Sequence, residues 1–182
     1  RGLGDVYKRQ DFVQRGAPAL MPKHLRAEMA LLGGADLVLE LPVQVSTASA
    51  EGFAAGGVSL LDGLGIVDEL CFGSECGDTE ILMETARILV AEPPAYRDFL
   101  QKNLRAGMSF PLARSRALTS YVAKSAISDV SSGDGHFIFS EQMDSILSSP
   151  NNILGIEYCK ALLHQHSSIR PHAPVSYTHL RA

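Results

Sequence analysis

The chain has 182 residues, of which 46% are apolar and 20% are charged, a balance typical of a folded globular domain with one sizeable core. This composition excludes a disordered tail, a collagen-like repeat and a disulfide-stapled miniprotein. Sixteen basic and twenty acidic residues leave a net charge of −4, so the overall charge does not indicate a strongly basic nucleic-acid-binding module. Any contact with RNA must come from a local patch.

The cysteine spacing and the absence of long apolar runs predict where the protein is found. Cys71, Cys76 and Cys159 match neither a disulfide framework nor a paired zinc site, which favours a reducing compartment. No apolar run reaches the roughly 18 residues needed to cross a bilayer, and residues 1–10 lack the apolar core of a signal peptide. We therefore expect a cytoplasmic protein with no membrane partner.

The two ends of the chain fit poorly with the residues between them. Residues 1–10 (RGLGDVYKRQ) and 175–182 (VSYTHLRA) are short, polar and without a periodic pattern, and both resemble translated sequencing-adapter ends. We expect them to be non-native, which leaves a native segment from about Asp11 to Pro174. On this interpretation the segment is an internal part of a longer protein.

Residues 11–77 alternate between helical and strand patterns. Leu25, Met29 and Leu32 recur at helical spacing ahead of two glycines that end the segment. The apolar run from Asp36 to Leu41 then predicts a buried strand.

A second helix and a second strand follow. The apolar face of this helix is made of Phe53, Gly57, Leu60 and Leu61, and the next strand is predicted from Val67 to Phe72. A strand, a crossover helix and a strand within about forty residues indicate a parallel pair. The predicted fold class is therefore α/β, with residues 11–77 as a partial Rossmann-like parallel sheet that binds a nucleotide.

Residues 78–174 are predicted to be mostly helical and to carry the second half of the nucleotide site. The helical patterns run over Thr79–Val90, Tyr96–Leu104 and Pro111–Ala123, and a loop is predicted from Ser128 to His136. The last helix begins at Ser149-Pro150, with the serine as the capping residue and the proline at the first helical position.

Charge is distributed unevenly along the chain. Between Leu31 and Asp98 twelve acidic residues face only Arg87 and Arg97, a local net charge of −10. From Phe99 to Ser128 there is no acidic residue, and five basic residues give +5: Lys102, Arg105, Arg114, Arg116 and Lys124. These cations predict a patch that tracks nucleic-acid phosphates, and the alternative is a solvated helical face.

The segment CFGSE, Cys71 to Glu75, is the strongest candidate for chemistry. In open α/β sheets ligands bind beyond the carboxyl ends of the strands, and Gly73 would lie at such an end. A glycine there lets a nucleotide approach the backbone closely, and Ser74 adds a hydroxyl donor. The alternative is an ordinary turn that needs a glycine. Cys71 itself is expected to be buried.

The segment SPNNILGIEY, Ser149 to Tyr158, is the second candidate. Asn151 and Asn152 lie in the first turn of a helix, where free backbone amides and the positive end of the dipole favour an anion. Their side-chain amides are suited to reading a base or a ribose. Simple capping of the helix is the alternative.

Arg15, in the segment DFVQRGAPAL, is a candidate phosphate clamp because its planar guanidinium can bind two oxygens at once. A surface ion pair is the commoner role for such a residue.

Several catalytic motifs are absent from the sequence. The chain has no G-x-x-x-x-G-K-[ST] loop, no H-E-x-x-H motif and no G-x-S-x-G elbow, so no metal site is predicted. The residues alone therefore indicate a nucleotide site without a defined reaction.

Taken in order, these motifs resemble a known family. DFVQRGAPAL, KHLRAEMAL, ADLVLELPV, SAEGFAAGGVSLL, LCFGSE, SPNNILGIEYCKAL and IRPH are similar to segments of the bacterial tRNA(Met) cytidine acetate ligases, relatives of the HIGH-type nucleotidyltransferases. The resemblance runs from Asp11 to about His172 and is weakest between Glu92 and Met143.

The resemblance implies an ATP-dependent ligase that activates acetate as acetyl-adenylate. The acetyl group would pass to N4 of the wobble cytidine of elongator tRNA(Met). In this family the glycine of the CFGSE loop and an asparagine at the start of the later helix bind ATP, and we expect the ATP to be accompanied by Mg²⁺. Here these residues are Gly73 and Asn151, with Asn152 as the further candidate.

The sequence also departs from the family. The H-x-G-H signature, whose histidines stabilise the phosphates, is absent, and Arg181 does not stand for the arginine that follows the I-x-P-H segment in the family. We therefore expect the 182-residue chain to be inactive and its catalytic residues to lie outside it. Two alternatives remain at this point: a non-catalytic nucleotide- or RNA-binding module, and a nucleotidyltransferase that acts on another carboxylate.

Overall fold

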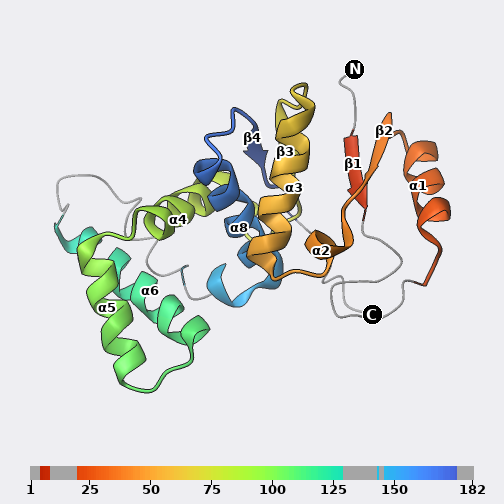
Figure 1. The fold of residues 1–182 in the computed structure, drawn as a ribbon. Coiled ribbons are helices and arrows are strands. Elements are labelled where there is room, and N and C mark those ends of the chain that lie inside the picture. The colour runs from red at the N-terminus through yellow and green to blue at the C-terminus, as the bar shows by residue number, and fades with distance from the viewer. Residues whose placement is uncertain (1–4, 9–19, 129–142, 144–145, 176–182) are drawn as a thin grey trace.

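The computed structural model describes residues 5–8, 20–128, 143 and 146–175. Figure 1 shows how the elements are arranged. In chain order they are β1 (Asp5–Lys8), α1 (Lys23–Leu32), β2 (Leu37–Glu40), α2 (Val43–Ser46), α3 (Ala50–Leu64), β3 (Glu69–Cys71), α4 (Thr79–Ala91), α5 (Pro94–Arg105), α6 (Phe110–Ser128), α8 (Pro150–His164) and β4 (Arg170–His172).

The predicted α/β class is confirmed, and helices α1, α3, α4, α5, α6 and α8 lie where the sequence predicts them, whereas the short helix α2 was not predicted. The predicted pairing of strands is wrong. β2 pairs in parallel with β1, and β3 pairs in parallel with β4, so the two strands expected to form one pair belong to separate two-stranded sheets in the described part of the chain. The prediction for residues 78–174 includes only helices and a loop and so misses one strand, because β4 contains Arg170 to His172.

β1 lies within the end that the sequence indicated to be non-native. Its backbone pairs with β2 from Asp5 opposite Leu37 to Lys8 opposite Glu40. A strand edge offers unpaired N–H and C=O groups to any extended segment, so pairing of this kind requires no apolar pattern in the added strand.

Helix α8 is the central element of the fold. It packs against α3 on one side and α4 on another, and Figure 1 shows it between these two helices. Nine of its residues, from Asn152 to Leu162, are buried. The core shared with α3 includes Phe53, Val58, Tyr158 and Leu162. A helix buried on most sides has its rotation fixed by packing, so each of its residues has a defined neighbour.

Helices α5 and α6 form an antiparallel hairpin that extends from the α4 side of the molecule (Figure 1). Tyr96 of α5 and Leu118 of α6 lie in one core cluster with Met143, Ile146 and Ile156. The hairpin is therefore attached to α8 through a continuous apolar contact.

Helix α1 differs from expectation in its packing. Its apolar stripe predicts a core face, but Leu25, Met29 and Leu32 are 44%, 53% and 81% exposed, and no residue of α1 is buried.

Within the described residues, no helix is long and apolar enough to cross a membrane.

Candidate functional site

The two motifs singled out in the sequence lie side by side. The chain leaves β3 at Cys71 and turns through Gly73 toward the first turn of α8. Between them is a cavity of about 400 Å³. Its lining residues are Cys71, Phe72, Gly73, Asn151, Leu154, Gly155 and Tyr158. Parts of the chain almost eighty residues apart thus form one cavity at the carboxyl end of a parallel strand, where α/β folds bind ligands.

The side chain of Asn152 holds the loop that follows β3. Its Oδ1 accepts hydrogen bonds from Ser74 Oγ at 2.9 Å, from the backbone N of Glu75 at 2.9 Å and from the backbone N of Cys76 at 3.1 Å. Asn152 is only 2% exposed and Ser74 is fully buried. Three donors on one buried amide oxygen fix the loop relative to α8, since unpaired buried donors are costly.

Glu75 makes the reciprocal contact. Its carboxylate accepts hydrogen bonds from the backbone N of Asn152 at 2.9 Å and of Asn151 at 3.3 Å. Ser149 and Pro150 occupy the predicted cap and first positions of the helix, but Glu75 is the acceptor for the first-turn amides. The expectation that these two amides are free for an anion is therefore wrong, because a carboxylate of the protein already occupies the positive end of α8.

These contacts divide the four predicted nucleotide-binding residues into two pairs. Gly73 and Asn151 line the cavity. Ser74 and Asn152 are not among its lining residues, and the Ser74 hydroxyl, which donates to Asn152, also accepts from the backbone N of Gly77 at 3.0 Å. Ser74 therefore has its hydroxyl hydrogen engaged within the protein, and it positions the loop on which Gly73 is carried.

The floor of the cavity is aromatic, which the sequence did not predict. The rings of Phe72 and Tyr158 stack with centroids 5.2 Å apart. A Cβ atom on Gly155 would lie 2.7 Å from the Phe72 ring, so α8 needs a glycine there for this close approach. The sequence signal that could have indicated this close approach is a glycine inside a helical pattern.

Two cysteines show opposite environments. Cys71 is exposed and lines the cavity, contrary to the expectation of burial. Cys159 is fully buried, and its desolvation raises the pKa of the thiol to about 12. Only Cys71 of this pair is therefore accessible to a thiol reagent at neutral pH.

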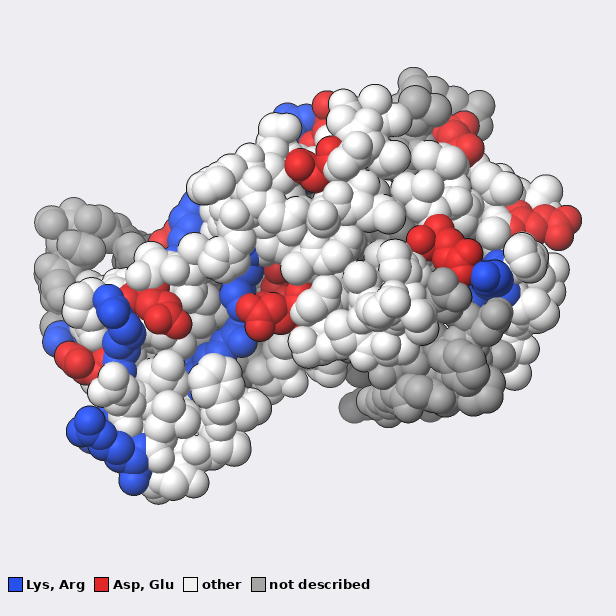
Figure 2. All heavy atoms as spheres, in the orientation of Figure 1, with Lys and Arg blue, Asp and Glu red and all other residues white. Residues whose placement is uncertain are grey.

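The five predicted tRNA-binding cations do not form one surface. Lys102, Arg105 and Arg116 are exposed on α5 and α6, where Figure 2 shows basic side chains gathered at one end of the molecule. Lys124 is also exposed, and its Nζ lies 6.0 Å from the centre of the Phe99 ring. Arg114 is instead 23% exposed and paired with Glu157, so it does not share the open surface of the other four cations.

Arg114 belongs to a chain of ion pairs across three helices. Its Nη2 lies 2.8 Å from Glu157 Oε1, and the other oxygen of this 3% exposed carboxylate lies 2.7 Å from Lys160 Nζ. Lys160 also contacts Glu51 of α3 at 3.1 Å. The hydrogen bond and charge of Lys160 lower the pKa of the Glu51 carboxyl below its usual 4.5. A buried carboxylate with two cations ties α6 to α8, and removing one partner would leave a buried charge unpaired.

Two further predictions concern Arg15 and a metal site. Arg15, the candidate phosphate clamp, lies outside the described residues. In the part of the chain that the structure describes, no group of three or more His, Cys, Asp and Glu side chains is placed to hold a metal ion.

Comparison with known proteins gives a family match over most of the chain. The family model described as HIGH Nucleotidyl Transferase matches residues 10–175. Two curated relatives are each named tRNA(Met) cytidine acetate ligase. The one from Clostridium perfringens is 45% identical over 161 residues, which cover 88% of this chain and 38% of the relative. The one from Acetivibrio thermocellus is 48% identical over 161 residues, which cover 88% of this chain and 35% of the relative.

Solved structures agree with these matches. A crystal structure of Thermotoga maritima TmcAL bound with alpha-thio ATP superposes with a TM-score of 0.85 at 38% identity, covering 99% of this chain and 41% of that one. The apo form of the same protein gives a TM-score of 0.81 at 40% identity, over 94% of this chain and 38% of that one. The chain therefore spans about two fifths of the length of its relatives, and the resemblance to this family stated from the sequence is confirmed.

The free energy of unfolding of alanine variants tests the different roles of Asn151 and Asn152. In Asn152→Ala, the Ser74 hydroxyl and the amides of Glu75 and Cys76 lose their acceptor, and we expect the free energy of unfolding to fall by about 1–3 kcal/mol or more. In Asn151→Ala, which shortens a half-buried side chain at the cavity, a change within about 0.5 kcal/mol is expected. Denaturant unfolding of both variants measures this, and equal losses would contradict the division of roles.

Proposed function

Because the chain belongs to the HIGH nucleotidyl transferase family, we propose that its cavity binds ATP in an enzyme that activates acetate and acetylates tRNA. In the proposed reaction an acetate oxygen attacks the α-phosphorus of ATP, pyrophosphate leaves, and acetyl-adenylate forms. The N4 amine of the wobble cytidine of elongator tRNA(Met) then takes the acetyl group, and AMP leaves. The proposal concerns the complete polypeptide, of which this chain would supply a part.

The observation that carries the proposal is the convergence of Gly73 and Asn151 on one cavity of about 400 Å³. This volume lies within the range of small-molecule sites, roughly 300–1,000 Å³. Leu154 and the stacked Phe72 and Tyr158 provide an apolar floor suited to an adenine ring or a ribose. Gly73 permits close approach of the nucleotide to the backbone, and the Asn151 amide offers both donors and an acceptor.

The names of the relatives and neighbours support the choice of substrates. The curated relatives are named for tRNA(Met), cytidine and acetate, and one solved neighbour is bound with alpha-thio ATP. In this proposal Mg²⁺ arrives with the phosphates of ATP, to which it commonly binds through few protein ligands. The location is the cytoplasm, where tRNA and ATP are both present.

The described residues bind and orient the nucleotide in this proposal. Adenylation depends mainly on holding the carboxylate in line with the α-phosphorus and on stabilising the charge that develops there. Gly73 and Asn151 would serve the first of these needs, and Ser74, Glu75 and Asn152 would keep them in place as positioning residues. The groups that stabilise the charge belong to the H-x-G-H signature, which this chain lacks.

The reaction is tested by the exchange of labelled pyrophosphate into ATP. We expect the complete polypeptide to catalyse exchange that depends on acetate and exceeds the rates with propionate and formate. We expect the 182-residue chain to show none. Exchange with Asn151→Ala should need about tenfold more ATP for half its maximal rate. Exchange without acetate, or with another acid preferred, would contradict the proposed substrate.

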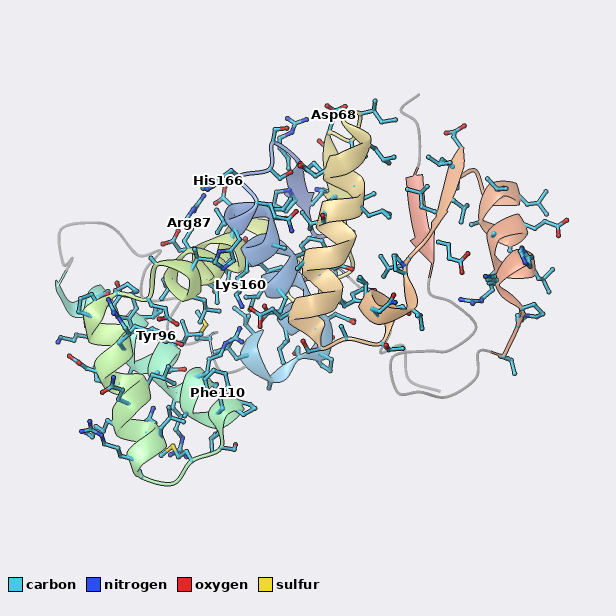
Figure 3. The ribbon with its side chains drawn as sticks, viewed as in Figure 1. Asp68, Arg87, Tyr96, Phe110, Lys160 and His166 are labelled. Carbon is cyan, nitrogen blue, oxygen red and sulfur yellow. The ribbon has the colours of Figure 1, made fainter. Side chains whose placement is uncertain are left out.

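We further propose that tRNA binds along the α5–α6 hairpin. Lys102, Arg105 and Arg116 are exposed there, and Phe110 is 57% exposed at the start of α6, where Figure 3 shows it at the end of the helix nearest α8. Exposed cations neutralise phosphates, and an exposed aromatic ring can stack on an unpaired base.

Salt dependence tests this surface. Replacing Lys102, Arg105 and Arg116 with alanine in the complete polypeptide is expected to weaken tRNA binding and to reduce the slope of log K against log salt by about 0.7 for each phosphate that is no longer neutralised. Arg87→Ala is the control, because Arg87 is an exposed cation of α4 paired with Glu84. A slope that stays unchanged in the triple variant would show that these cations face solvent only.

A further inference from the structure

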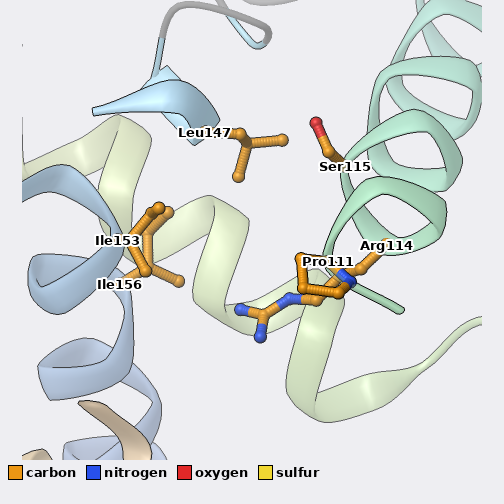
Figure 4. Close-up of a pocket in the computed structure, with 6 residues that line it drawn as sticks. All are labelled: Pro111, Arg114, Ser115, Leu147, Ile153 and Ile156. Carbon is orange, nitrogen blue, oxygen red and sulfur yellow. The ribbon is translucent and has the colours of Figure 1, made fainter. Parts of the chain in front are cut away.

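A second cavity lies on the other side of α8. It has a volume of about 100 Å³ and is bounded by the start of α6, the first two turns of α8 and one residue that precedes α8 (Figure 4). Its lining residues are Pro111, Arg114, Ser115, Leu147, Ile153 and Ile156.

The two cavities use opposite faces of the same helix. The ATP cavity is lined by Asn151, Leu154, Gly155 and Tyr158, which recur every three or four residues on one face of α8. Ile153 and Ile156, in the second cavity, are rotated by about half a turn from that face. An α-helix is about 10–12 Å across with its side chains, so the two sites are separated by the thickness of one helix.

The lining of the second cavity combines apolar walls with a fixed cation. Leu147, Ile153 and Ile156 provide the walls, and Figure 4 shows the guanidinium of Arg114 extending from α6 along the cavity toward α8. Its Nη2 donates to Glu157, which fixes the orientation of the whole planar group. A guanidinium has five N–H donors, and one such bond leaves others for a ligand.

Charge distinguishes between a neutral and an anionic ligand. In the chain of ion pairs that includes Arg114, the two cations Arg114 and Lys160 are matched by the two carboxylates Glu157 and Glu51. The cluster has no net charge, and Glu157 would repel a small carboxylate such as acetate. A neutral ring with hydrogen-bond acceptors fits apolar walls and an oriented guanidinium better.

The volume of the cavity and the residues beside it restrict the class of ligand further. The cavity has about one third of the volume at the lower end of the range for small-molecule sites, which suits one six-membered ring better than a purine. Phe110 lies one helical turn before Arg114 and is exposed on the same side of α6. An aromatic ring beside an apolar slot is typical of sites that take an unstacked base.

We propose that this cavity is a base-reading subsite that takes an unpaired pyrimidine of the tRNA, distinct from the cytidine that is acetylated. The proposal rests on the proposed function. An RNA strand cannot pass through the buried helix α8, so the base read here reaches the cavity from around the helix and belongs to another nucleotide of the same loop. Arg114 donates to the pyrimidine acceptors, and Glu157 positions Arg114.

The test uses the complete polypeptide and the anticodon stem-loop RNA of elongator tRNA(Met), with each unpaired loop nucleotide replaced in turn by an abasic one. With the wild type, one abasic position other than the target cytidine should weaken binding about tenfold. Ile153→Phe places a ring in the cavity from a residue that is 36% exposed, so the fold should tolerate it. This variant should bind intact RNA about tenfold more weakly and lose the abasic effect at that position.

Leu112→Phe is the matched control, since it makes the same kind of change at a 45% exposed position of α6 outside the cavity. It should behave like the wild type. Ser115→Leu fills the cavity from the α6 side and should reproduce Ile153→Phe if the latter fails to fold. The salt slope should be the same in all these proteins, because phosphate contacts are untouched.

The outcomes separate this subsite from the proposed function. Salt-dependent RNA binding with no abasic effect at any loop position other than the target cytidine, or an abasic effect that Ile153→Phe leaves intact, would overturn the subsite alone. A raised KM for acetate in Ile153→Phe with an unchanged response to abasic RNA would assign the cavity to acetate and overturn it as well. Absence of both RNA binding and acetate-dependent exchange would overturn both proposals.

Discussion

The reciprocal contact between Asn152 and the loop at residues 74–76 is the constraint on which the site depends. The Asn152 amide oxygen accepts three hydrogen bonds from the loop, and the Glu75 carboxylate accepts two from the first turn of α8. Each such bond contributes about 1 kcal/mol, and those to the charged carboxylate contribute more. Together they hold the end of β3 and the start of α8 at the separation that leaves a cavity between them, with Gly73 on one side and Asn151 on the other.

Helix α8 connects this site to the rest of the molecule. One face lines the cavity beside β3, and a different part of the helix surface carries Glu157, whose buried carboxylate pairs with Arg114 of α6 and Lys160 of α8. The ion pairs and the apolar contact around Ile156 set the position of the α5–α6 hairpin relative to the cavity. A nucleotide on one face and RNA on the other would therefore be held in a fixed relation by a single buried helix.

The sequence predicts the helices and both motifs of the site, because apolar spacing and helix-end signals are local properties. The residues alone do not predict which of two adjacent asparagines faces the cavity, although the family resemblance favours Asn151. Asn151 and Asn152 differ by about 100° of rotation, and the rotation of α8 is set by packing against distant residues such as Phe72. The same limit applies to Arg114, whose partner Glu157 is 43 residues away. Strand β4 was missed because three residues with a central proline carry no strand pattern.

The most direct test of the central claim, that the cavity between β3 and α8 binds ATP, is the rate at which iodoacetamide alkylates Cys71. Cys71 lines the cavity and is exposed, whereas Cys159 is buried with a thiol pKa of about 12 and is the internal control. Saturating ATP with Mg²⁺ should slow alkylation of Cys71 at least tenfold in the complete polypeptide, as followed by mass spectrometry, and leave Cys159 unmodified throughout. An unchanged Cys71 rate under acetate-dependent exchange would mean that ATP binds elsewhere and would contradict the claim.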